Sequence, residues 1–121
     1  VLTRHADVKW TFVLMHKPVW MREAGNNFDS MEKALDDRPY TVINGHFHAY
    51  SHQERNGRDY IILGTTGGSQ NPTNPGSYDH ITLVNMTEQG PSIVNLKMGG
   101  ILDKTGKIPL GGDSLRYEPT R

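Results

Sequence analysis

The sequence has 121 residues, with thirteen Lys and Arg balanced by thirteen Asp and Glu, and it contains no cysteine. This length suits one domain or half of a larger one. The balanced charge gives no general reason to expect nucleic acid or an anionic membrane as a partner. The missing thiols exclude disulfides, thiolate metal sites and cysteine nucleophiles, and no apolar run approaches the roughly 20 residues of a membrane-spanning helix.

Two short apolar runs in the first half of the chain predict buried strands. Residues 10–15 are β-branched or aromatic with almost no polar alternation, and residues 40–43 repeat this pattern. Runs of this kind are typical of strands that are buried on both faces of a sheet. Pro18 forces a loop after the first run, and Asn44-Gly45 ends the second.

One clear helix is expected between these two strands. Apolar residues recur at helical spacing from about residue 30 to residue 37, which favours an α-helix there. Asn27 and Asp29 both have side chains that cap helix starts, so either is a candidate cap. The preceding residues, 19–27, give only a weak helical signal.

Hairpins and loops are predicted for the second half of the chain. Asn56-Gly57 lies between two strand-like runs and is a strong signal for a hairpin turn. Residues 64–76 are rich in Gly, Asn, Thr and Pro, which indicates a loop. The strand-like runs come in two pairs, each joined by turn residues: 50–55 with 60–63, and 80–86 with 92–98.

Three histidines that follow the two buried strands form the candidate site. His16 comes after the first strand, and His46 and His48 come after the second, preceded by Gly45. Ligands gather at the carboxyl ends of strands in sheets of this kind. In an extended segment, residues i and i+2 point to the same side, and Gly45 permits unusual backbone angles. Imidazoles suit several first-row metals, so the pattern predicts a metal site, with loop histidines bonded to backbone as the simpler alternative.

The other histidines and the Gly-rich loop have simpler interpretations. We interpret His5, His52 and His80 as structural or solvated. Residues 65–69 (TTGGS) offer hydroxyls and glycines for a phosphate, but they lack the lysine and spacing of a P-loop, which favours a plain loop. A serine hydrolase is disfavoured because Asn71 stands where a nucleophile elbow needs its last glycine.

The sequence resembles the calcineurin-like phosphoesterases. W-T-F-V-L-M-H-K-P at residues 10–18 resembles their strand followed by His-x-Pro, and N-G-H-F-H at 44–48 resembles their G-H-x-H motif. Residues 78–81 resemble a late strand of the bacterial purple-acid-phosphatase-like branch. The resemblance covers most of the chain. It implies an α/β fold (α+β for an isolated half), with residues 1–103 as the C-terminal half of a β-sandwich flanked by helices. Residues 104–121 form a Gly-rich tail, which we expect to be partly disordered.

This resemblance also implies roles for the three histidines. In the family, the His before Pro and the first His of G-H-x-H bind one metal of a pair, and the second His binds the other. His16 and His46 would therefore share one divalent ion (Zn, Mn or Fe), and His48 would bind its neighbour. The family's Asp-x-His, bridging Asp and Asn-His ligands come from an N-terminal half without counterpart in this sequence. We expect at most one weakly bound ion and no catalytic residue in this half.

Two functions remain open at this stage. The first is part of a metal-dependent phosphomonoesterase or phosphodiesterase that acts on a small phosphoester and has little turnover without its N-terminal half. The second is a stand-alone metal-binding or structural module that oligomerises without catalysis. One helix covers only part of a sheet that is apolar on both faces, so we expect the N-terminal half or a second copy as a partner. The family leans towards periplasmic or secreted proteins, while the chain itself indicates no compartment.

Overall fold

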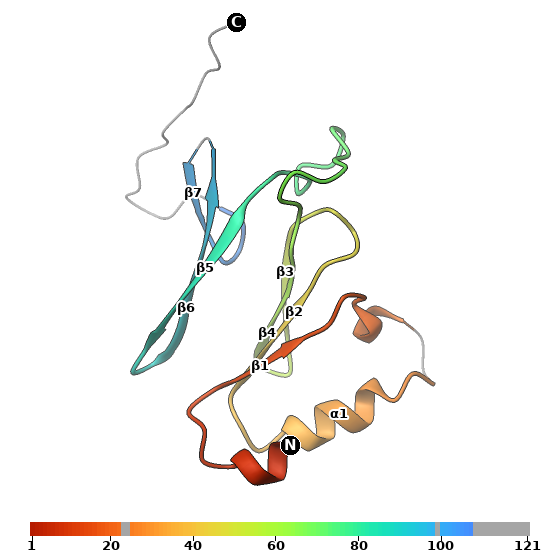
Figure 1. The fold of residues 1–121 in the computed structure, drawn as a ribbon. Helices are drawn as coiled ribbons and strands as arrows, with labels where there is room; N and C mark the ends of the chain where they lie inside the picture. The colour runs from red at the N-terminus through yellow and green to blue at the C-terminus, as the bar shows by residue number, and fades with distance from the viewer. Residues whose placement is uncertain (23–24, 99, 108–121) are drawn as a thin grey trace, which may run out of the picture.

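The computed structural model describes residues 1–22, 25–98 and 100–107. Within these residues the chain forms a four-stranded sheet of order β1-β2-β4-β3 and a three-stranded sheet of order β5-β6-β7 (Figure 1). The predicted mixed α/β class, with short strands and one α-helix, is confirmed. The elements are η1 (Leu2–His5), β1 (Thr11–Leu14), η2 (Val19–Met21), α1 (Phe28–Leu35), β2 (Tyr40–Asn44), β3 (Ser51–Arg55), β4 (Arg58–Ile62), β5 (Ile81–Thr87), β6 (Gly90–Lys97) and β7 (Gly100–Asp103).

Three parallel strands of the four-stranded sheet have their carboxyl ends on the same side of the sheet. β1 pairs with β2 and β2 pairs with β4, both in parallel. β3 runs antiparallel to β4. Both turn residues between β3 and β4 have positive φ, 52° at Asn56 and 65° at Gly57. This is the conformation that a two-residue Asn-Gly hairpin requires, so the predicted hairpin is confirmed.

Both faces of the central strands are covered within this one chain. Tyr60 and Ile62 point to one face of β4 and pack with α1 and η2, whereas Ile61 points to the other face and packs with Ile93 of the second sheet. The side chain of Ile61 is fully buried. The expectation that one helix would leave a face of this sheet uncovered is therefore wrong, because the β5-β6-β7 sheet covers it.

The first strand differs from its prediction. β1 is shorter than the apolar run at 10–15, and it lies at the edge of its sheet. Leu14 is 72% exposed, so the expected burial on both faces is wrong. The physical reason is that Leu14 stands where the parallel strands end and lines an open pocket instead of the core.

The helix begins earlier than predicted and is capped differently. α1 starts at Phe28, whose buried ring joins the core. Asn27 has a left-handed conformation (φ 61°), and its side chain makes no capping bond. The side chain of Asn26 accepts a hydrogen bond from the Phe28 N–H at 3.0 Å and donates one to the Val19 carbonyl at 2.7 Å. No helix among the described residues is long and apolar enough to cross a membrane.

The turn after β7 is tied back to the first sheet. The Lys104 ammonium lies 2.8 and 2.7 Å from the two carboxylate oxygens of Asp59. The Tyr50 hydroxyl donates to the Lys104 carbonyl. Lys104, the first residue of the expected tail, therefore contacts the body of the protein, and residues 108–121 lie outside the described part of the chain.

Candidate metal centre

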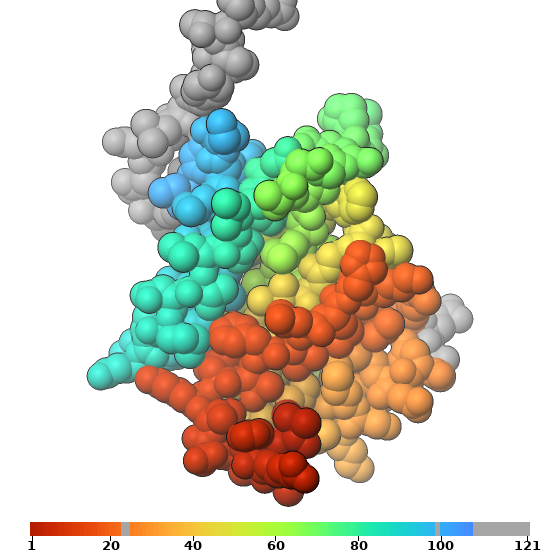
Figure 2. Space-filling view, in the orientation of Figure 1, coloured from red at the N-terminus to blue at the C-terminus, as the bar shows by residue number. Residues whose placement is uncertain are grey.

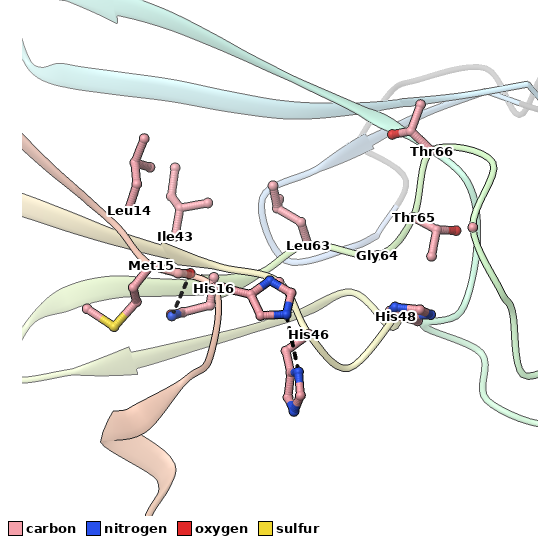
Figure 3. A pocket seen from close by; sticks show the side chains of 13 residues that line it. Leu14, Met15, His16, Ile43, His46, His48, Leu63, Gly64, Thr65 and Thr66 are labelled. Atoms are coloured by element: carbon pink, nitrogen blue, oxygen red, sulfur yellow. Dashed lines mark hydrogen bonds between the residues drawn. The ribbon is translucent and has the colours of Figure 1, made fainter. Parts of the chain in front are cut away.

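His16 and His46 lie side by side because parallel pairing continues beyond the strand ends. The Met15 N–H donates to the Ile43 carbonyl at 3.1 Å, and the Gly45 N–H donates to the His16 carbonyl at 3.0 Å. The two imidazoles meet edge to face, with 3.3 Å between Nε2 of His16 and Nδ1 of His46 (Figure 3). The structure thus brings together the two histidines that we expected to share an ion.

His48 lies apart from this pair, although all three histidines line one pocket (Figure 3). Its Nδ1 is 3.0 Å from the Ser69 carbonyl oxygen. A carbonyl only accepts hydrogen bonds, so Nδ1 carries the proton and Nε2 of a neutral His48 keeps a free lone pair. Among the described residues no three His, Cys, Asp or Glu side chains form a group able to hold one metal ion.

The backbone from His46 to His48 is not extended, so the expectation of an extended segment there is wrong. His46 has φ 77° and His48 has φ 53°, both in the left-handed region. Gly45 does not need a positive φ, and a Cβ there would make ordinary contacts with His16. Histidine tolerates this region better than most residues, yet each such residue costs on the order of 1–3 kcal/mol and such residues cluster at functional sites. The strain thus falls on the two motif histidines themselves.

Asn44 fixes the positions of both strand ends, and the sequence analysis did not single it out for this role. Its buried Oδ1 accepts a hydrogen bond from the Trp20 indole at 2.8 Å. Its Nδ2 donates to the carbonyls of Met15 and Lys17, each at 3.2 Å. These two carbonyls flank His16, so one side chain holds the His16 segment against the end of β2. The feature of the sequence that could have indicated this role is an amide side chain at the end of an apolar run.

The pocket that the histidines line is open and has a volume of about 660 Å³. Leu14, Ile43 and Leu63 form an apolar part of its wall, and the loop at residues 64–68 forms another part. The hydroxyls of this loop are already used, because Thr65 donates to the Asp79 carboxylate and Thr66 to the His80 carbonyl. This bonding agrees with the interpretation of a plain loop.

The surroundings of His46 favour its neutral form. Its pKa lies below the usual value, first because of desolvation and then because of the basic side chains nearby, those of His16, Lys17, Arg22 and His48. A neutral imidazole is the form that binds a metal ion. The same basic groups make the pocket attractive to an anion.

The remaining three histidines lie outside this pocket. His5 is exposed in η1. His52 pairs with Asp59, with 2.7 Å between Nε2 and the carboxylate. His80 is buried, with its ring against those of Tyr50 and Tyr78, and this burial lowers its pKa. Each therefore has a structural or solvated position, as interpreted from the sequence.

The spacing of the paired imidazoles fits two positions of a metal site. Zinc binds histidine nitrogens at about 2.0–2.1 Å, and two such ligands at a tetrahedral angle lie about 3.3–3.4 Å apart. The observed separation is 3.3 Å. A direct N–H···N hydrogen bond also fits this distance, with one ring as donor and the other as acceptor. The spacing thus fits both arrangements, and a metal site at this pair needs further ligands.

No protein-family model matches the chain, and no curated protein matches it. Among solved structures, the chain is similar to a single mutant of Vps29 from Entamoeba histolytica, at 20% sequence identity and a TM-score of 0.46. The similarity covers 72% of this chain and 49% of that one, so this chain spans about half the length of the structure it matches. A likeness at this level concerns the course of the backbone alone.

Proposed function

We propose that this chain forms part of a calcineurin-like metallophosphoesterase that hydrolyses phosphomonoesters or phosphodiesters. In this proposal His16 and His46 bind one divalent ion, and His48 binds a neighbouring ion. The observation that carries it is the 3.3 Å separation of two imidazole nitrogens at the carboxyl ends of adjacent parallel strands. The His-x-Pro and G-H-x-H motifs at these positions give it further support.

The residues of the pocket have distinct tasks under this proposal. A divalent ion supplies Lewis acidity and lowers the pKa of bound water. His16 and His46 hold it through ring nitrogens that already face each other. The bond of His48 to the Ser69 carbonyl orients its ring with Nε2 free, as partners of metal-binding histidines commonly do. Lys17 and Arg22 add positive charge that attracts a phosphoester.

A stand-alone metal-binding or structural module is the second candidate. It is favoured by the central strands, whose two faces are covered within the chain. It is also favoured by the ligand set, since the described residues supply a pair of imidazoles rather than a group of three. The gene sequence upstream of Val1 separates the two: an Asp-x-His, a Gly-Asp and a Gly-Asn-His encoded there support the hydrolase.

Metal binding is tested by calorimetric titration of the protein with zinc and with manganese. We expect weak binding of one ion per chain. His16→Ala and His46→Ala should each weaken it by roughly tenfold or more, because each removes a direct ligand. His5→Ala is the matched control, since His5 is exposed and lies outside the pocket. Equal binding by wild type and both pocket variants, or equal losses in all three variants, would contradict the site.

Activity is tested with bis-p-nitrophenyl phosphate in the presence of manganese or zinc. We expect feeble turnover or none from this chain, because a two-metal centre needs carboxylate ligands that the described part of the pocket does not supply. Robust hydrolysis that disappears in His46→Ala would mean that the expectation is wrong and that fewer ligands suffice. Robust hydrolysis that survives in His46→Ala would point to a contaminating enzyme or to another site.

A further inference from the structure

One face of the three-stranded sheet is apolar and exposed. Cross-strand pairing places Ile81, Leu96 and Ile101 in one row across the three strands, and Leu83 pairs with Val94 in a neighbouring row. Directly paired residues point to the same face of a sheet. The large apolar side chains on this outer face, or directly beyond its end, are exposed to different degrees: Ile81 63%, Leu83 53%, Leu96 37%, Met98 85% and Ile101 52%.

The opposite face of the same sheet is the one that packs on the body of the protein. Ile93 and Asn95, which alternate with the outer-face residues of β6, are 4% and 0% exposed. Figure 1 shows the β5-β6-β7 sheet beside the first sheet, and in Figure 2 the β5–β6 hairpin forms a margin of the molecule. Within the described part of the chain, the large apolar side chains of the outer face therefore remain exposed.

Charge on this face argues for an apolar partner. Among its described positions only Asp103 is charged, and its carboxylate accepts hydrogen bonds from the backbone N–H and the hydroxyl of Thr105. Lys97 is turned to the other side, where its ammonium lies 4.2 Å from the centre of the Tyr78 ring. Nucleic acids and anionic membranes select basic surfaces, and this face offers none. A second apolar, uncharged surface is its complement.

The extent of the face suits a weak pair of identical chains. A large aliphatic side chain that is fully removed from water buries about 100 Å², so these five side chains expose roughly 300 Å² per copy. Two copies face to face would bury about 600 Å² from these side chains alone, which is over half of the roughly 1,000 Å² expected of a specific interface. The polar positions beside them, Asn85 and Ser92, supply the rim.

A hollow at one end of the face adds a specific feature. This pocket has a volume of about 300 Å³ and is lined by Ile81, Leu96 and Met98 together with the polar residues Thr66, Asp79, His80 and Lys97. Met98 is the most exposed of the apolar side chains on this face, and methionine adapts its shape to irregular apolar surfaces. In a two-fold pair the same residues meet on both copies, so each Met98 can fill the hollow of the other.

We propose that the outer face of the β5-β6-β7 sheet is a self-association surface through which two copies of this chain form a two-fold dimer. The sequence led us to expect a partner on the first sheet, but the chain covers the faces of that sheet by itself. The proposal therefore places the partner on the second sheet. The proposal does not depend on the metal site, because Ile81, Leu83 and Ile101 do not line the histidine pocket.

The association is tested by analytical ultracentrifugation over a range of concentrations. We expect a dimer with a dissociation constant on the order of 10 µM, because the interface is small. Leu83→Lys should raise this constant by roughly tenfold or more, since each copy would then bring an unpaired ammonium group into the apolar contact. Met21→Lys is the matched control: Met21 is 54% exposed against 53% for Leu83, and it lies in η2, away from this sheet.

A second measurement keeps the proposal testable if Leu83→Lys fails to fold. The chain has no cysteine, so Leu83→Cys and Met21→Cys each introduce a single thiol. Under mild oxidation, Leu83→Cys should form a covalent dimer much faster than Met21→Cys. A wild-type protein that remains monomeric at about 100 µM, equal dissociation of the two lysine variants, or equal cross-linking of the two cysteine variants would overturn the proposal.

Discussion

Asn44 is the residue through which the fold positions the candidate site. Its side chain makes three hydrogen bonds, one accepted from the Trp20 indole and two donated to the carbonyls of Met15 and Lys17. All of them lie at the point where β1 and β2 end and the histidine segments begin. Asn44 itself is 2% exposed, so water does not replace these partners freely.

Substitution of this residue should therefore destabilise the protein. We expect Asn44→Ala to lower the free energy of unfolding by about 1–3 kcal/mol, because it leaves the buried Trp20 indole N–H without an acceptor. Asn44→Asp keeps the oxygen that accepts from Trp20 but loses both N–H donors. It should therefore place a carboxylate against the two carbonyls that flank His16 and also destabilise the protein. Urea denaturation followed by tryptophan fluorescence measures both, and a loss under about 0.5 kcal/mol in Asn44→Ala would contradict this role.

At the scale of helices and strands, the features that could be predicted are those set by residues close together in the sequence. The β3–β4 hairpin follows from Asn56-Gly57, because the φ values that the turn requires are a property of those two residues. The buried strand β2 and the presence of one helix follow from residue patterns in the same way. The pairing of His16 with His46 followed from motifs after two strands, since parallel strands bring their carboxyl ends to one edge.

Features that depend on neighbours from elsewhere in the chain could not be predicted. Leu14 is exposed because it lies at the end of β1 and lines an open pocket, which the apolar run does not reveal. The helix α1 is held by Glu32, whose carboxylate accepts two hydrogen bonds from Arg55 and one from the Tyr60 hydroxyl. The hydrogen bonds from Arg55 are the main reason that the pKa of Glu32 lies below its usual value. No periodicity in the sequence indicates this pairing.

At the scale of the whole molecule, an ion pair joins the two sheets in addition to their apolar packing. Asp59 at the start of the central strand β4 binds Lys104, which follows the last strand, β7. Its other partner is His52 on β3. Burial alone raises the pKa of Asp59, but the hydrogen bonds from Lys104 and His52 more than offset this, so the pKa lies below its usual value. The ionised carboxylate thus stabilises the docking of the second sheet.

A carboxylate whose pKa is depressed by folding makes stability depend on pH in one direction. Its contribution is present above the pKa of the unfolded chain, about 3.9 for Asp, and is lost as the pH falls through the lower pKa of the folded state. We expect Lys104→Met to cost about 0.5–1 kcal/mol at pH 7, since the Lys104 side chain is 44% exposed. The cost should shrink as the pH falls below about 4, from the pKa of Asp in the unfolded chain towards the lower pKa of Asp59 in the folded protein. Thermal melts from pH 3 to pH 7 measure this difference. Lys9→Met is the control: it removes an exposed lysine far from Asp59 in the sequence and should leave the dependence of stability on pH unchanged. If the cost of Lys104→Met is the same at every pH in this range, the ion pair is not the source of that cost.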